Sequence, residues 1–183
     1  YLTHLESLKL WKNEISDDSM EFLVSSKNFS NLKTLMLNDN ILTPLGATII
    51  AKSENFMKLE SLNLFRNEVS DEGALAFSKS KHFPNLETLY LGDNKITDKG
   101  AVVLIGSIAF PALKTLDLGK NLLGEASAMA AFNVVISDCS ESSSALLVSK
   151  PPSFLPPQAA NSAMMESVIN IFFIIINIIN IQF

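Results

Sequence analysis

The sequence predicts an α/β solenoid, a right-handed stack of repeats with a curved parallel sheet on its concave side and short helices on its convex side. Three observations lead to this fold class. Leucines and asparagines recur every 27 residues. Apolar and polar residues alternate just before each asparagine, as in a half-buried strand. A Ser or Thr that can cap a helix then follows each of the first four asparagines.

The repeat unit has the pattern LxxLxLxxNx(I/L/V). Its asparagine column consists of Asn13, Asn40, Asn67, Asn94 and Asn121. Its leucine columns begin at Leu5, Leu8 and Leu10 and continue every 27 residues to Leu113, Leu116 and Leu118. Because buried polar groups need hydrogen-bond partners, we expect the asparagines to form a structural ladder that bonds the backbone of neighbouring repeats.

Each repeat is expected to contain one strand and one helix. In the segment TLYLG, Leu89 and Leu91 alternate with polar or small residues, which places the leucines on the buried face of a strand. The expected helix caps are Ser16, Thr43, Ser70 and Thr97. The residues that follow them are Asp17, Pro44, Asp71 and Asp98, which suit a first helical turn because of the helix dipole and the fixed φ of proline. The core is expected to include a phenylalanine column after the helices, made of Phe29, Phe56, Phe83 and Phe110.

The segment LETLYLGDNKITDKGA resembles the leucine-rich-repeat family, and within it the ribonuclease-inhibitor-like subclass. The resemblance covers about residues 2–126. It implies a solenoid in which every strand is followed by a helix, and helices that are short because these repeats are slightly short for that subclass. Related repeats occur in cytoplasmic NOD-like receptors and in ribonuclease inhibitor. The resemblance implies binding of another protein.

The period divides the chain into three regions. Residues 1–136 are expected to form the solenoid of about five repeats, and we treat Tyr1 as a cut end because the chain opens inside a repeat. Residues 137–167 are rich in Ser and Pro and are interpreted as a linker. Residues 168–183 form an apolar tail of Ile, Asn and Phe without a charge.

The tail leaves three interpretations open. A membrane anchor needs about 20 apolar residues, and this stretch is shorter and carries Asn170, Asn177, Asn180 and Gln182. The second interpretation is a segment prone to β-aggregation. The third, which we favour, is translation beyond a true exon end. With the linker before it, the favoured interpretation predicts a disordered or poorly structured C-terminal tail.

The composition excludes several classes of function. The chain has 183 residues, 48% of them hydrophobic, and a net charge of −5. A mildly acidic chain lacks the clustered basic surface that nucleic acid requires, so no nucleic-acid partner is expected. Cys139 is the single cysteine, which rules out an internal disulfide. A solenoid without Cys-rich caps favours an intracellular, cytoplasmic protein.

Partner-binding candidates lie on the strands, at positions that point away from the core. The large ones are Trp11, Met36, Phe65 and Tyr90, and aromatic residues are enriched in binding hot spots. A neighbouring column alternates in charge: Lys12, Asp39, Arg66, Asp93 and Lys120. Opposite charges on adjacent strands stabilise stacking. Lys12 and Arg66 could instead contact a partner in a charged docking strip.

The sequence contains no set of residues that predicts an enzyme. His4 and His82 lie in different columns, and no nucleotide-binding, zinc-protease or hydrolase motif is present. We therefore expect no catalytic, cofactor-binding or metal-binding residues and no small-molecule substrate. The leading hypothesis is a protein-interaction module that binds through its concave face. The alternatives are a regulator of an enzyme, such as a GTPase-activating protein for small GTPases, and a scaffold tethered to a membrane by its tail.

Overall fold

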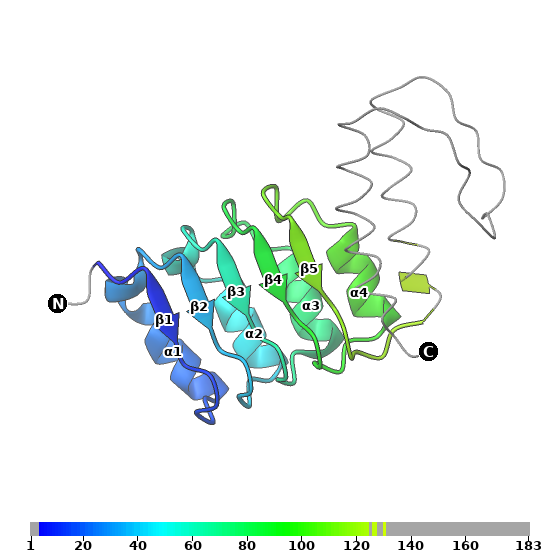
Figure 1. Cartoon of the computed structure of the whole chain (residues 1–183), viewed down its shortest axis with the longest axis horizontal. Coiled ribbons are helices and arrows are strands. Elements are labelled where there is room, and N and C mark those ends of the chain that lie inside the picture. Colours follow the sequence, from blue (N-terminus) through cyan, green and yellow to red (C-terminus); the bar gives the residue numbers. More distant parts are fainter. Residues whose placement is uncertain (1–3, 125, 128–129, 131–183) are drawn as a thin grey trace, which may run out of the picture.

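The computed structural model of the chain describes residues 4–124, 126–127 and 130. Five short strands form one parallel sheet in which sequence order and spatial order coincide, as Figure 1 shows. The strands are β1 (Ser7–Lys9), β2 (Thr34–Met36), β3 (Ser61–Asn63), β4 (Thr88–Tyr90) and β5 (Thr115–Asp117). The predicted fold class is confirmed: the repeats stack into a parallel sheet with short helices.

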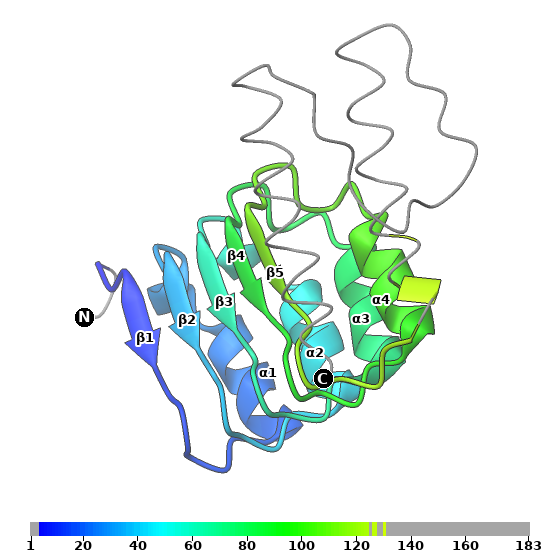
Figure 2. The same cartoon turned by 45° about the vertical axis from the view of Figure 1, so that its right-hand side comes forward.

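The described helices lie together on one side of the sheet, and none of them covers its other side (Figure 2). They are α1 (Asp17–Ser25), α2 (Pro44–Ala51), α3 (Ser70–Ser78) and α4 (Asp98–Ile105), with two 3₁₀ turns, η1 (Lys27–Phe29) and η2 (Glu54–Phe56). Each helix has only eight or nine residues, too few to be stable alone. Packing of each helix against its neighbours and the sheet therefore has to supply its stability.

The register of the sheet follows the 27-residue period. Leu8 pairs with Leu35, Leu35 with Leu62, and Leu62 with Leu89. Paired residues are one repeat length apart, so each leucine stacks on the equivalent leucine of the next repeat. Leu35, Leu62 and Leu89 are completely buried. In the phenylalanine column Phe56, Phe83 and Phe110 are buried, and Phe29 is half-buried.

The start of α3 differs from the expected pattern. Thr43 and Thr97 precede α2 and α4 in extended conformation, and their side chains accept from the N–H groups of Leu45 and Lys99. Ser70, which we expected to be a cap, is instead the first residue of α3, with a positive φ of 53°. Ser16 precedes α1 in extended conformation but makes no side-chain cap bond. The cause at Ser70 lies in the preceding repeat, as described below.

Several sequence expectations concern residues that the structure does not describe. The linker 137–167 and the tail 168–183 lie outside the described residues, as do residues 131–136 at the end of the expected solenoid. Among the described residues, none of the helices is both long enough and apolar enough to cross a membrane.

Candidate protein-binding face

The candidate site is the face of the sheet opposite the helices, which we call the open face. Its side chains come from the strand positions that alternate with the buried leucines and from the two residues after each strand's second leucine. The large members are Lys9, Met36, Asn63, Tyr90 and Asp117 in one column and Trp11, Asn38 and Phe65 in the next. The backbone ladder continues past the strands, because Asp39 N donates to Phe65 O at 2.9 Å and Arg66 N to Gly92 O at 2.9 Å. The open face thus has a rigid base.

The asparagine column lies beneath the open face, where each strand ends. The Nδ2 of Asn94 donates to Leu64 O of the preceding repeat at 2.8 Å, and its Oδ1 accepts from Val69 N at 3.1 Å. Asn40, Asn67 and Asn121 make equivalent bonds to the repeat before them. These four are buried, whereas Asn13 is exposed and its Nδ2 donates only to Trp11 O. The column joins the strand ends of neighbouring repeats and so holds the outward residues in place.

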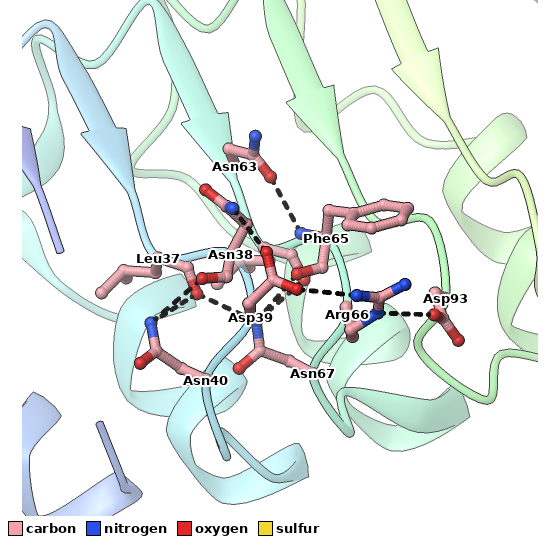
Figure 3. Close-up of polar contacts among 10 residues, drawn as sticks. Leu37, Asn38, Asp39, Asn40, Asn63, Phe65, Arg66, Asn67 and Asp93 are labelled. Atoms are coloured by element: carbon pink, nitrogen blue, oxygen red, sulfur yellow. Dashed lines mark hydrogen bonds and ion pairs between the residues drawn. The ribbon is translucent and has the colours of Figure 1, made fainter. Parts of the chain in front are cut away.

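Arg66 connects three repeats at the rim of the open face. Its guanidinium donates from Nη1 to Asp39 Oδ1 at 3.0 Å and from Nε to Asp93 Oδ2 at 3.1 Å (Figure 3). These two bonds, first that to Asp93, raise the pKa of Arg66 above its usual value. Asn38 donates to Asp39 Oδ2 at 2.8 Å and, together with Arg66, lowers the pKa of the Asp39 carboxyl. The guanidinium of Arg66 therefore stays protonated, and its positive charge is balanced by carboxylates of the same chain.

The alternating charges lie beyond the strands rather than on them. All five residues of this column have positive φ, between 52° and 59°, so they occupy the turn that follows each strand. Lys12 and Lys120 form no ion pair with a described residue; Lys12 Nζ lies 5.6 Å from the ring centre of Trp11. The expected opposite-charge pairs form at the centre of the column, where Arg66 pairs with Asp39 and Asp93.

The ring of Phe65 lies against a glycine of the next repeat, Gly92. A Cβ on Gly92 would lie 2.9 Å from Phe65 Cδ2, so the ring occupies the space that a side chain would need. Arg66 Cζ and Lys120 Nζ each lie 5.5 Å from the ring centre, within the range of cation–π attraction. Gly92 was not recognised from the sequence, and its place beside Phe65 in the repeat register was the available signal.

The remaining aromatic candidates stand at separate places on the open face. Trp11 keeps 49% of its surface exposed at the β1 end, whereas Met36 and Tyr90 are half-buried on β2 and β4. The four apolar candidates thus lie on one face, spread over the first four repeats, and Lys12 and Arg66 lie at its rim in the turns after β1 and β3. Their role in binding stays a prediction.

Sequence reasoning missed a second set of inter-repeat contacts on the helix side. Asp71 Oδ1 accepts from Thr97 N at 2.7 Å and its Oδ2 from Thr97 Oγ1 at 2.7 Å. Asp17 binds Thr43 in the same way, at 2.9 and 2.5 Å. Asp98 Oδ1 accepts from Gly124 N and Ser127 N, and these bonds, first that from Ser127, lower the pKa of Asp98. Each carboxylate caps the next helix, and the Asp–Thr spacing of 26 residues was its sequence signal.

Family comparisons agree with this geometry. Residues 58–102 match the model described as leucine rich repeats in two copies, and residues 1–24 match a leucine rich repeat. These two segments are similar to leucine-rich repeats. A solved structure of an internalin from Listeria monocytogenes str. 4b F2365 is similar, with 26% identity and a TM-score of 0.49. That similarity covers 68% of this chain but only 32% of the internalin, and no curated protein sequence matches significantly.

The described residues hold no group of three or more His, Cys, Asp or Glu side chains that could bind a metal ion. Several acidic side chains of these repeats bind the start of the next helix or pair with Arg66 and lysines.

Proposed function

We propose that the leucine-rich repeats bind a partner protein through the open face. The observation that carries this proposal is a contrast on the open face: the charge of its central arginine is paired within the chain, whereas its large apolar side chains stay partly accessible. Arg66 is bonded to two aspartates, while Trp11, Met36 and Tyr90 keep part of their surface accessible on the side of the sheet opposite the described helices. Aromatic side chains presented on a rigid base lose little conformational entropy on binding, which favours their use as anchors.

The internal pairing of charges defines the kind of binding. A face whose central arginine is paired with two aspartates presents little unbalanced charge there, and salt screens what remains, so it attracts a partner only weakly over long distances. We therefore expect association through this face to depend weakly on salt and strongly on the aromatic residues. The assignment to the ribonuclease-inhibitor-like subclass and a cytoplasmic setting belong to the same proposal.

The proposal can be tested with binders selected from a displayed peptide or protein library against the full chain. Hydrogen exchange of the complexes should show protection of residues around β1 to β4. The double variant Trp11→Ala, Tyr90→Ala should weaken the selected binders by at least about tenfold, as expected for loss of hot-spot residues. The matched control Phe22→Ala, Leu45→Ala removes two exposed apolar residues from the helices and should change affinity less than about twofold.

The outcomes are distinguishable. If most binders instead protect the helices and are lost in the control variant, the open face is not the preferred surface. The alternatives from the sequence, a regulator of small GTPases and a tail-tethered scaffold, would be supported by accelerated GTP hydrolysis or by membrane partition that is lost on deletion of residues 168–183. Neither has a specific observation in its favour among the described residues.

A further inference from the structure

The two long edges of the repeat stack carry opposite charge. We call the edge where helices end and the next strands begin, at the top of Figure 1, the helix-to-strand edge; it comprises residues 25–33, 52–60, 79–87 and 106–114. It contains seven lysines and three glutamates, a net charge of +4. The opposite strand-to-helix edge, residues 12–18, 39–45, 66–72, 93–99 and 120–124, contains five basic and nine acidic residues, a net charge of −4.

Four lysines of the helix-to-strand edge form neither an ion pair nor a side-chain hydrogen bond with another residue in the part of the chain that the structure describes. Lys33 pairs with Glu6 and Lys114 with Glu87, at 3.1 and 2.8 Å, and Lys58 donates to Asn31. The remaining lysines are all exposed and form no ion pair with a described residue; they are Lys27, Lys52, Lys79 and Lys81.

Helix dipoles account for only part of this cluster. Lys52 and Lys79 are the C-caps of α2 and α3, where a positive charge is favourable. Lys27 lies in η1 beyond the end of α1, and Lys81 lies two residues beyond the cap of α3. The latter two lysines have no helix end of their own to stabilise.

The four lysines lie on the first three repeats and are followed by an apolar side chain on the fourth. Ile108 occupies the position of Lys27 and Lys81 in the repeat register and is 97% exposed. Met57, also on this edge, is exposed too. Neighbouring helices pack about 8–10 Å apart, so the run from Lys27 to Lys81 spans roughly 20 Å, the length of about six extended residues.

We propose that the helix-to-strand edge is a second interaction surface, separate from the open face, and that it binds an acidic, extended protein segment. Charge complementarity selects the chemistry of the partner, because four unpaired ammonium groups attract carboxylates. The interleaved Glu54, Glu60 and Glu87 disfavour a uniformly negative surface such as a lipid bilayer, since they would be pressed against like charge. A peptide can place its acids beside the lysines alone.

A second copy of this chain is a poorer occupant. The carboxylates of its acidic edge are largely engaged within the chain: Asp17, Asp71 and Asp98 cap helices, and Asp39, Asp93 and Glu68 pair with Arg66 or Lys95. Using them for docking would require breaking those bonds. The lysines of the helix-to-strand edge need no such exchange.

The test uses the full chain and a fluorescein-labelled peptide of eight residues containing six glutamates and a terminal leucine, followed by fluorescence anisotropy. We expect binding that weakens steeply between low and physiological salt. The double variant Lys52→Gln, Lys79→Gln should weaken it about fivefold, the effect of two exposed charge contacts. The control Lys95→Gln, Lys99→Gln removes the same charge from the opposite edge and should leave the affinity within about twofold.

Each other result overturns the proposal. Equal weakening by both variants would show attraction by the whole chain rather than by this edge, and absence of peptide binding would show that no such surface exists. Binding to vesicles containing phosphatidylserine but not to the peptide would assign the lysines to lipid. Light scattering that reveals concentration-dependent oligomers, abolished by Lys52→Gln, Lys79→Gln, would assign them to a second copy.

Discussion

The junction between the third and fourth repeats has an aspartate that the junction between the second and third lacks. At the first of these, Asp71 binds both the N–H and the hydroxyl of Thr97, whose Oγ1 in turn accepts from Lys99 N at 3.2 Å. At the second, the residue in the position of Asp71 is Pro44, which has no acceptor in its side chain. There the N–H of Ser70 donates instead to Asn94 O of the following repeat, at 2.9 Å.

The difference shows how one repeat sets the backbone of the next. An extended cap residue directs its N–H toward the preceding repeat, where an aspartate receives it. Without that acceptor the N–H must find another partner, since a buried orphan donor is costly. The N–H of Ser70 points to the carbonyl of Asn94, in the following repeat, and Ser70 has a φ of 53° there, a conformation unfavourable for a residue with a Cβ. Its hydroxyl then bonds Glu72 and lowers the pKa of that carboxyl.

Removal of the aspartate cap should have the largest effect on stability. Asp71→Ala leaves Thr97 N, Thr97 Oγ1 and Gly100 N without their acceptor, so we expect a loss of about 2 kcal/mol in the free energy of unfolding. Urea denaturation followed by circular dichroism measures it. Asp18→Ala, an exposed aspartate in the first turn of α1, is the control and should change stability by less than about 0.5 kcal/mol. Equal losses of unfolding free energy in the two variants would show that Asp71 contributes no more than an exposed aspartate, which contradicts its role as an acceptor between repeats.

A pair of glycine substitutions should have opposite signs at the two junctions. Ser70→Gly relieves the positive φ and should stabilise the chain by roughly 0.5–1 kcal/mol. Thr97→Gly removes a hydroxyl that bonds both Asp71 and Lys99 N and should destabilise by about 1 kcal/mol. Thermal unfolding of both variants measures the two changes. Destabilisation by Ser70→Gly would mean that its contact with Glu72 outweighs the backbone strain.

The missing cap can also be restored. Pro44→Asp supplies a carboxylate in the position that Asp17 and Asp71 occupy, so Ser70 can adopt the extended form of Thr43 and Thr97. We expect a gain of about 0.5 kcal/mol, because the new cap is offset by the loss of the rigid proline. Pro44→Ala, which adds no acceptor, is the matched control. A lower melting temperature for Pro44→Asp than for Pro44→Ala would contradict the role given to the aspartates.

The smallest expected effect is a dependence on acidic pH at Asp98. Hydrogen bonds from Ser127 and then Gly124 lower the pKa of this carboxyl in the folded chain. Its contribution to stability is therefore present above the ordinary carboxyl pKa and is lost as pH falls through the lower folded-state value. Asp98→Asn should unfold with a smaller difference between pH 6 and pH 3 than the parent chain. Identical pH profiles would show that the cap does not titrate with folding.

Much of the stack could be predicted because it repeats. The leucine columns, one strand per repeat and the asparagine column follow from a 27-residue period combined with the two-residue alternation of a strand. The aspartates were assigned to the helix dipole of their own repeat, whereas Asp17 and Asp71 bind the next one. The glycines behind them were also missed: a Cβ on Gly100 would lie 2.6 Å from Asp71 Oδ1, so only glycine leaves room for that carboxylate.

The candidate open face was predictable in its membership and not in its electrostatics. Alternation places Trp11, Met36, Phe65 and Tyr90 opposite the buried leucines whatever their neighbours are. Whether Arg66 is free or neutralised depends on the distance across two turns to Asp39 and Asp93, and the alternating signs alone did not show that Lys12 and Lys120 turn to aromatic rings.

By itself the sequence determined the period, the buried columns and the parallel register, because these need only the spacing of apolar side chains and their removal from water. Only the tertiary structure decided which acceptor each helix start receives, where Ser70 turns, and which lysines remain without a carboxylate. Those outcomes depend on contacts between residues 26 or 27 positions apart, and such contacts exist only once the repeats have stacked. Pro44 illustrates the division: its helical position was predictable, and its effect on the following repeat was not.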